Sequence, residues 1–216
     1  VMLKYKLKEK GWVSQRFGEN KALYAKLGLP GGHHGVDTVQ GWGKPIRSDN
    51  PGLVYKVVQN AETNASQVHQ LVHLGGEDYV EIAYVHLSEI YVRQGDIIPE
   101  GLLIGAEGNL GLVYSGGGQI TPAMQDAGDR RGTHLHWQVR PVLRVKRQIK
   151  DRHYLRNADG TAYRDEEGSV FEIKYNDNGF KGCVDPMTYV YENSRAENMA
   201  MFFKIGTYIL AQKVTK

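Results

Sequence analysis

The chain has little of several residue types, and each shortage excludes a class of protein. It holds a single cysteine, Cys183, in 216 residues, which excludes an internal disulfide framework and a cysteine-based zinc finger. Its 7 prolines are few while its 26 glycines are many, a balance that predicts many turns and few helices. The most apolar run, residues 199–211, is interrupted by Lys204 and Gly206. It falls short of the roughly 20 apolar residues that a membrane span needs, so we expect no membrane insertion.

Net charge is also small. Lysine and arginine number 27 against 24 acidic residues, a formal charge of +3 that is too low and too dispersed to predict nucleic-acid binding. Residues 1–6 are charged and lack an apolar core, so we expect no signal peptide there. With 41% hydrophobic and 24% charged residues, the composition is that of a folded chain of one large or two small domains.

The pattern along the chain is that of strands and turns. Residues 52–58 are rich in β-formers, and two further apolar segments, 68–74 and 79–87, flank a Gly-Gly-Glu-Asp turn that predicts a hairpin. Residues 133–140 alternate between polar and apolar, as a half-buried strand does. We predict a mainly β fold with antiparallel strands.

Three segments stand apart from these strands. Residues 111–132 form a predicted loop, and the more polar residues 141–181 carry turn signals at 157–160 and 176–179 that predict an inserted β lobe. Ser194 is a candidate cap for a C-terminal helix over 191–216, with an apolar stripe at Met199, Phe202, Phe203 and Ile209.

Histidines supply the candidate chemistry. On a strand, His134 and His136 share one face, because side chains alternate with period two. A glycine-rich turn offers His33 and Asp37, one nitrogen and one oxygen that zinc accepts. Taken singly, the first pair is more simply explained as a polar strand face and the second as a surface turn. Taken together, His33, Asp37 and His136 make a three-ligand set of the kind that leaves a fourth zinc position for water.

Two more histidines complete this hypothesis. His134 is placed to accept a proton from water, and His86, expected on the same strand face as Tyr84, to stabilise the charge of a tetrahedral intermediate. His69 and His73 offer a rival pair, because ligands four apart on a helix form the His-Glu-x-x-His site. The glutamate is missing and the segment has strand character, so we expect a structural role for both.

Several motifs follow one another in the order of a known family, and together they resemble the lysostaphin/LytM-type zinc metalloendopeptidases of peptidoglycan. The main motifs are His33-His34-Gly35-Val36-Asp37, Tyr84-Val85-His86-Leu87-Ser88, Gly108-Asn109-Leu110-Gly111 and Gly132-Thr133-His134-Leu135-His136. Shorter matches lie at 15–18, 92–96, 104–105 and 184–186. The resemblance spans residues 13–140 and 182–190.

The resemblance implies an antiparallel β-sheet groove with zinc at its floor. It implies zinc ligation by His33, Asp37 and His136, catalysis by His134 and His86, and a variable position at His34 whose side chain points away. Two insertions, 112–131 and 141–181, depart from the family pattern. Both adjoin the strand that carries the histidines, so we expect them to wall the cleft, within a zinc peptidase domain that covers residues 1–190.

The implied activity is hydrolysis of peptide cross-links or stem peptides in the bacterial cell wall. The expected setting is a bacteriophage lysis enzyme or a virion tail enzyme with phage tail proteins as partners, acting at the periplasmic or extracellular wall. Two alternatives are a non-catalytic regulatory or binding module of the same fold and a structural virion component. Zinc content and turnover of a cross-linked muropeptide would separate the enzyme from the regulatory module. Association with virions, together with normal infection by a His136→Ala variant, would favour the structural component.

Overall fold

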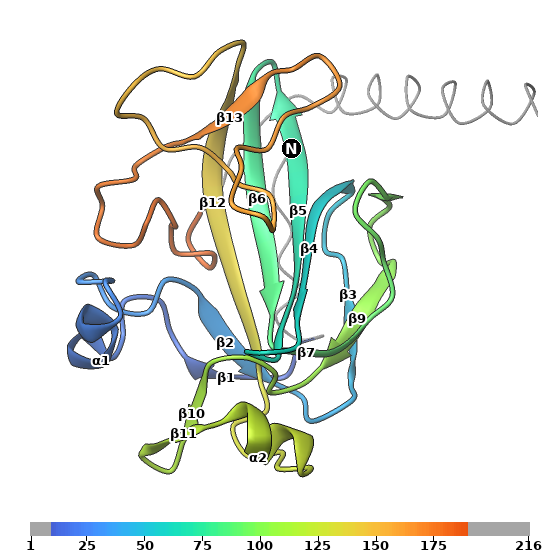
Figure 1. Ribbon diagram of the computed structural model, residues 1–216, viewed down its shortest axis with the longest axis vertical. Coiled ribbons are helices and arrows are strands. Elements are labelled where there is room, and N and C mark those ends of the chain that lie inside the picture. The colour runs from blue at the N-terminus through green and yellow to red at the C-terminus, as the bar shows by residue number, and fades with distance from the viewer. Residues whose placement is uncertain (1–9, 190–216) are drawn as a thin grey trace, which may run out of the picture.

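The computed structural model describes residues 10–189, and antiparallel β-strands make up most of its regular structure (Figure 1). Within these residues the helices are short, α1 (Lys21–Lys26) and α2 (Pro122–Asp126). The strands are β1 (Trp12–Gln15), β2 (Val36–Val39), β3 (Pro45–Arg47), β4 (Gly52–Asn60), β5 (Ala65–Gly75), β6 (Asp78–Val85), β7 (Leu87–Ile90), β8 (Ile97–Ile98), β9 (Leu103–Glu107), β10 (Val113–Ser115), β11 (Gly118–Ile120), β12 (Leu135–Val145) and β13 (Val170–Ile173). The mainly β prediction is confirmed.

The C-terminal helix expected over 191–216 lies outside the described residues. Within residues 10–189, neither helix has the length and apolar character needed to cross a bilayer.

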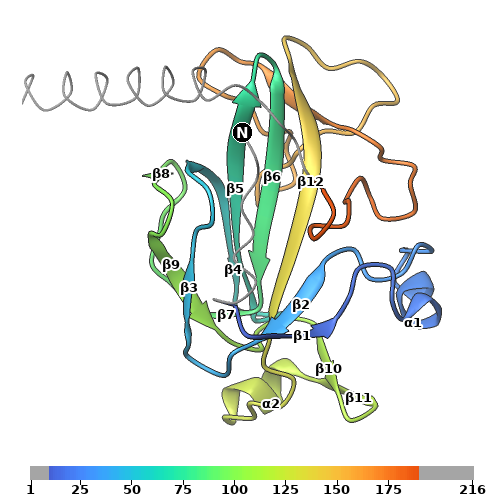
Figure 2. The ribbon, with the colours of Figure 1, turned by 180° about the vertical axis from the view of Figure 1, so that it is seen from behind.

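The main core lies between two sheets. The larger sheet has the order β1-β2-β12-β6-β5-β4-β8, with β13 added on β12, and the smaller has the order β3-β9-β7. Figure 2 shows β3 and β9 beside the larger sheet. Ile46, Leu87 and Ile104 of the small sheet pack against Tyr84 and Trp137 of the large one, and all five side chains are at most 2% exposed. One face of the large sheet is thereby filled.

The opposite face carries the polar residues of β12. Strand register pairs His136 with Val85 and Trp137 with Tyr84, so His136 lies on the side away from the core that Trp137 enters. The same alternation brings Val142, six residues further along β12, to the face of His136. Metal-ligand candidates and an apolar patch therefore share one face.

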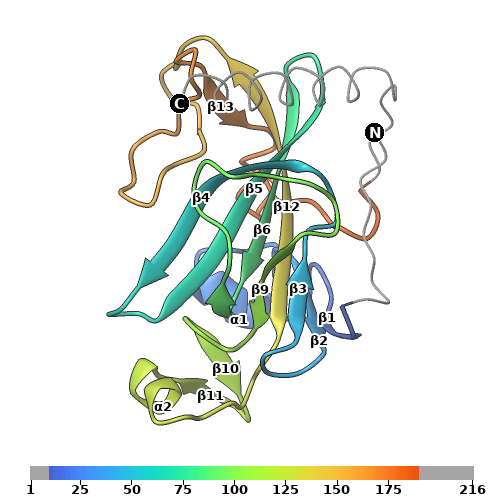
Figure 3. The same ribbon diagram turned by 90° about the vertical axis from the view of Figure 1, so that its right-hand side faces the viewer.

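The 141–181 segment covers the far end of that face. Leu155, Tyr163 and Phe171 form a second buried cluster with Val142 and Tyr55 of the large sheet. Figure 3 shows β13 at one end of β12, and α2 with the β10–β11 hairpin at the other. The two insertions thus lie at opposite ends of β12, which carries His136 and directly follows His134.

Two local expectations were wrong, and one was confirmed. The strand predicted over 79–87 ends at Val85, because His86 adopts a left-handed backbone with φ of 68° and Leu87 begins β7 in the other sheet. The 111–132 segment is more than a loop, since it holds the β10–β11 hairpin and α2, which the Thr121 side chain caps. The predicted turn at 157–160 is confirmed, because it joins the paired residues Arg156 and Ala162; a turn also occupies 176–177, without a strand pair on either side.

Candidate metal centre

Strand pairing brings the candidate ligands together. Asp37 on β2 lies directly opposite His136 on β12 in the antiparallel register, so their side chains share a face. His33 precedes β2 in the glycine-rich turn, where Gly32 has a φ of 106° that favours glycine. All three side chains are buried, with exposed fractions of 0% for His33 and 6% for Asp37 and His136.

Their ligand atoms converge on one point. His33 Nε2 lies 2.8 Å from His136 Nδ1 and 3.1 Å from Asp37 Oδ1, and His136 Nδ1 lies 2.9 Å from the same oxygen. Among the described residues, this is the group of three or more such side chains whose geometry suits a metal ion. Two ligands about 2.0–2.1 Å from a tetrahedral zinc lie about 3.3 Å apart, so a small outward movement would admit the ion.

The outer hydrogen bonds of the two imidazoles orient their lone pairs inward. His33 Nδ1 lies 3.1 Å from the Arg16 carbonyl, and His136 Nε2 lies 3.3 Å from Gln138 Oε1. Both partners accept hydrogen bonds, so each ring donates outward and presents its other nitrogen to the Asp37 carboxylate. The two ring nitrogens and the carboxylate oxygen are electron-rich, so at this spacing they need a cation or a proton between them. Metal-binding histidines are commonly oriented by such outward hydrogen bonds. The donor set therefore fits zinc.

Asp37 is held in its charged form. Burial by itself would raise its pKa, but the close contacts with His136 and His33, together with the neighbouring His134, lower the pKa well below its ordinary value. A carboxylate that stays ionised is the form that binds a metal.

His134 and His86 lie beside this cluster. His134 Nε2 is 3.7 Å from Asp37 Oδ2, and the rings of His134 and His86 lie 4.5 Å apart. Each Nδ1 faces a backbone carbonyl, that of Gly132 at 2.6 Å for His134 and that of Leu110 at 2.8 Å for His86. In the neutral state each ring donates from Nδ1 and presents a lone pair at Nε2.

The orientation of His86 differs from the expected one. Tyr84 points into the core between the sheets, so a continued strand would direct residue 86 there as well. The left-handed backbone at His86 ends the alternation, and the ring contacts His134 instead. The expected shared face with Tyr84 is therefore wrong. Burial, followed by the charges of His134 and His136, lowers the pKa of His86 well below its ordinary value.

Of the remaining histidines, His69 and His73 lie away from the candidate centre, whereas His34 lies beside it. His69 and His73 are on β5 rather than on a helix, and His69 Nδ1 bonds to the buried Glu81 at 2.8 Å. His34 was expected to point away, and this is wrong, because its ring centre lies 4.9 Å from that of His136. Burial, together with the charges of His136 and His33, lowers the pKa of His34 to about 2.

Sequence reasoning did not single out Tyr24 and Gln138. Tyr24 of α1 packs its ring 5.2 Å from that of His33, and burial, then Asp37, raises its pKa. No motif marks α1. Gln138 was identifiable, because on a strand it shares the face of His134 and His136.

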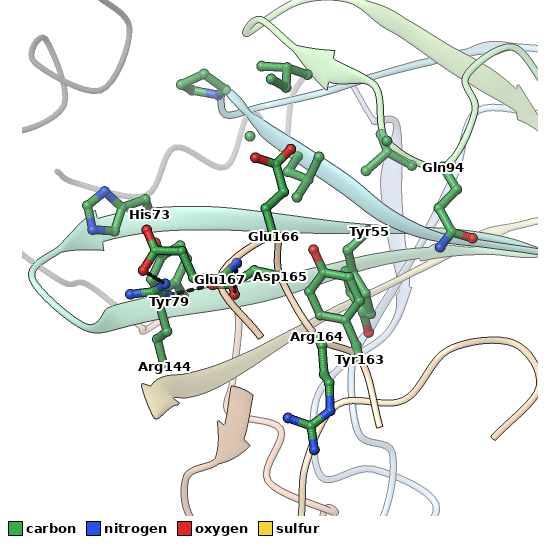
Figure 4. Close-up of a pocket in the computed structure, with 16 residues that line it drawn as sticks. Tyr55, His73, Tyr79, Gln94, Arg144, Tyr163, Arg164, Asp165, Glu166 and Glu167 are labelled. Atoms are coloured by element: carbon green, nitrogen blue, oxygen red, sulfur yellow. Dashed lines mark hydrogen bonds and ion pairs between the residues drawn. The ribbon is translucent and has the colours of Figure 1, made fainter. Parts of the chain in front are cut away.

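A cavity of about 550 Å³ lies apart from these histidines (Figure 4). It opens between the start of β4 and residues 163–167 of the insertion, with Tyr55, Tyr79 and Tyr163 in its lining and Arg144 paired to Asp165. None of the five candidate site residues lines it. Arg144 follows His136 by eight strand residues, or about 26 Å at about 3.3 Å per residue, so the candidate chemistry lies on the open sheet face and outside the cavity.

Comparison with known proteins decides the family. Residues 31–150 match peptidase family M23, and this region contains every candidate ligand and both further histidines. The chain belongs to peptidase family M23. The resemblance seen in the motifs is confirmed.

Individual relatives of this M23 peptidase share part of its length. Over 86 residues it is 33% identical to the glycyl-glycine endopeptidase ALE-1 of Staphylococcus capitis, a match that covers 39% of this chain and 23% of that relative. The chain therefore spans about a quarter of the length of that curated relative.

Solved structures with a similar fold were also found. The catalytic domain of lysostaphin from Staphylococcus simulans is 22% identical with a TM-score of 0.45, and the match covers 62% of this chain and 83% of that one. A zinc-containing peptidase from Vibrio cholerae is 20% identical with a TM-score of 0.44, and the match covers 61% of this chain and 34% of that one.

Proposed function

We propose that this M23 peptidase is a zinc-dependent endopeptidase that hydrolyses peptide cross-links or stem peptides of peptidoglycan. The observation that carries the proposal is the convergence of His33, Asp37 and His136, with one ring nitrogen of each imidazole within 3.1 Å of the same carboxylate oxygen. We assign these three as the zinc ligands. The action of the relative from Staphylococcus capitis on glycyl-glycine bonds supports a peptide of the cell wall as substrate.

Bound there, zinc would supply Lewis acidity for the scissile carbonyl and acidify a water molecule. The protons are transferred by the chain's own side chains. His134 Nε2 presents a lone pair next to Asp37 Oδ2, so it accepts the proton of the attacking water. After water oxygen bonds to the carbonyl carbon, the carbon–nitrogen bond breaks and His134 returns that proton to the leaving amine.

The proposed role of His86 needs a particular protonation state. The neutral ring spends its donor on the Leu110 carbonyl, so its Nε2 has no hydrogen with which to bind an oxyanion. His86 therefore stabilises negative charge only while Nε2 also carries a proton, a state that the low pKa of His86 permits only once negative charge develops beside the ring. Because the rings of His86 and His134 are in contact, we assign the two histidines as a pair that shares one proton during the reaction.

Two substitutions test the assignments. His136→Ala should abolish both stoichiometric zinc and turnover of a cross-linked muropeptide, because it removes the third ligand. His134→Ala should retain zinc, measured by atomic absorption, and lose turnover, because the ring lies outside the ligand set. Zinc retained by His136→Ala, or lost by His134→Ala, would contradict the roles given to the two histidines.

The regulatory alternative predicts a chain that loads no zinc and cuts nothing. A chelator should abolish turnover, and added zinc should restore it, if the chain is the proposed enzyme. Mass spectrometry of fragments released from walls with glycine-bridged or direct cross-links would identify the bond. The bacteriophage setting, with tail proteins as partners, and action at the cell wall stay predictions, which detection of the chain in purified virions and infection by a His136→Ala phage would check.

A further inference from the structure

A short loop fixes the position of the His86 ring. Residues 108–111 follow β9, and the carbonyl of Leu110 accepts the hydrogen bond from His86 Nδ1 at 2.8 Å. The loop lies close to the ring, because a Cβ placed on Gly111 would be 3.8 Å from His86 Nδ1. Gly111 has a φ of 93° and no side chain of its own to hold it. A loop that ends in such a residue needs a brace from outside to stay in one conformation.

The 112–131 insertion supplies that brace. Gln125 of α2 is 3% exposed, and its Nε2 donates to the carbonyls of Asn109 at 2.7 Å and Gly111 at 2.8 Å. These are the two residues on either side of Leu110. Both partners are acceptors, so the amide must present its NH₂ end to the loop.

A second pair of bonds ties the loop to the insertion in the other direction. Asn109 Nδ2 donates to the carbonyls of Asp129 and Arg131, each at 2.9 Å. The insertion is therefore built around the loop, and Gln125 is its closest link to the Leu110 carbonyl. The metal-ligand candidates come from the 31–37 segment and β12, and Gln125 directs its hydrogen bonds to the carbonyls of Asn109 and Gly111 instead.

We propose that Gln125 is a positioning residue for His86, which it orients by holding the 109–111 loop and its Leu110 carbonyl in place. This inference rests on the proposed function, in which His86 acts during hydrolysis. A displacement of about 1 Å in a catalytic group can cost about 100-fold in rate. Loss of the brace should therefore lower kcat about 10- to 100-fold, with zinc content and KM nearly unchanged.

Gln125→Met tests this, because methionine keeps the length of the side chain and removes both donors. The variant and the wild type would be compared in the zinc-loaded state for zinc stoichiometry, kcat and KM on one soluble muropeptide. Side-chain ¹⁵N spectra would report which nitrogen of His86 carries hydrogen. We expect the wild type to show Nδ1–H on His86 and the variant to show a mixture of tautomers.

Two controls separate positioning from general support of the insertion. Gln119→Met makes the same change at an exposed position of β11 and should keep full activity. Asp126→Ala removes the bond of 2.8 Å from Asn64, which ties α2 to the turn between β4 and β5, and should lower stability with kcat retained. Gln125→Asn keeps the donor on a shorter side chain and should lower kcat by less than Gln125→Met.

The outcomes distinguish this inference from the proposed function. If wild type is active, His86→Ala is inactive and Gln125→Met keeps kcat and the His86 tautomer, the inference is overturned while the function stands. Equal losses of kcat in Asp126→Ala and Gln125→Met would also overturn it, because docking of the insertion would then explain both. A zinc-loaded wild type without hydrolytic activity would instead refute the proposed function.

Discussion

Gly35 lies against a proposed zinc ligand, and a single methyl group there should weaken metal binding. A Cβ built on Gly35 would be 2.7 Å from His136 Cε1, 2.9 Å from its Nε2 and 2.6 Å from the Trp137 carbonyl oxygen. The carbonyl belongs to β12 and cannot easily move, so the imidazole or β2 must shift. Ordinary contact begins at 3.4 Å, which leaves Gly35→Ala short by 0.7 Å at Cε1.

That shift exceeds what a zinc site tolerates, since ligand distances hold to within about 0.2 Å. We expect the zinc dissociation constant of Gly35→Ala to rise about 10- to 100-fold, the range seen when the support of a ligand is lost. Each tenfold corresponds to about 1.4 kcal/mol. Competition with a chromogenic chelator would measure it.

Gly118→Ala is the matched control, because a Cβ there meets nothing within 4 Å. Its zinc affinity should equal that of the wild type. If Gly35→Ala also binds zinc as tightly as the wild type, with circular dichroism unchanged, then His136 does not hold the metal at the position assigned to it.

Two further predictions concern the buried charges of the large sheet. Glu81 accepts hydrogen bonds from Arg140 at 2.7 Å and from His69 at 2.8 Å. Glu81→Gln leaves Arg140 without its carboxylate and should lower the free energy of unfolding, measured in urea, by about 3–5 kcal/mol. A loss below about 1 kcal/mol would show that the pair is not buried in solution. Burial alone would raise the pKa values of Glu81 and Asp37. Arg140 and His69 lower the pKa of Glu81, and the neighbouring histidines lower that of Asp37. Below about pH 5 the unfolded chain therefore binds more protons than the native one, so the metal-free protein should lose stability as the pH falls further, and Glu81→Gln should reduce that slope. A flat profile between about pH 5 and 3 would contradict the assigned directions.

Local pattern was sufficient for much of the fold. Strand alternation predicted the hairpin of β5 and β6 and the start of β12, because period two is a property of the backbone itself. It also placed His134 and His136 near one another without knowledge of any partner strand. Residue order further marked His33 and Asp37 as a candidate pair.

Tertiary structure decided the rest. The pairing of Asp37 opposite His136 joins residues 99 apart, and the rotation of His86 toward His134 depends on a left-handed backbone between two sheets. Long-range contacts also explain three further features. Gln125 bonds to the 109–111 loop, the ring nitrogens of His33 and His136 face Asp37, and residues 141–181 cover one end of the sheet face. Sequence alone determined that β5, β6 and the start of β12 form and how their residues alternate between the two faces, since these follow from local geometry. Only the assembled sheets determined which of those faces meet, because that depends on side chains brought together from distant parts of the chain.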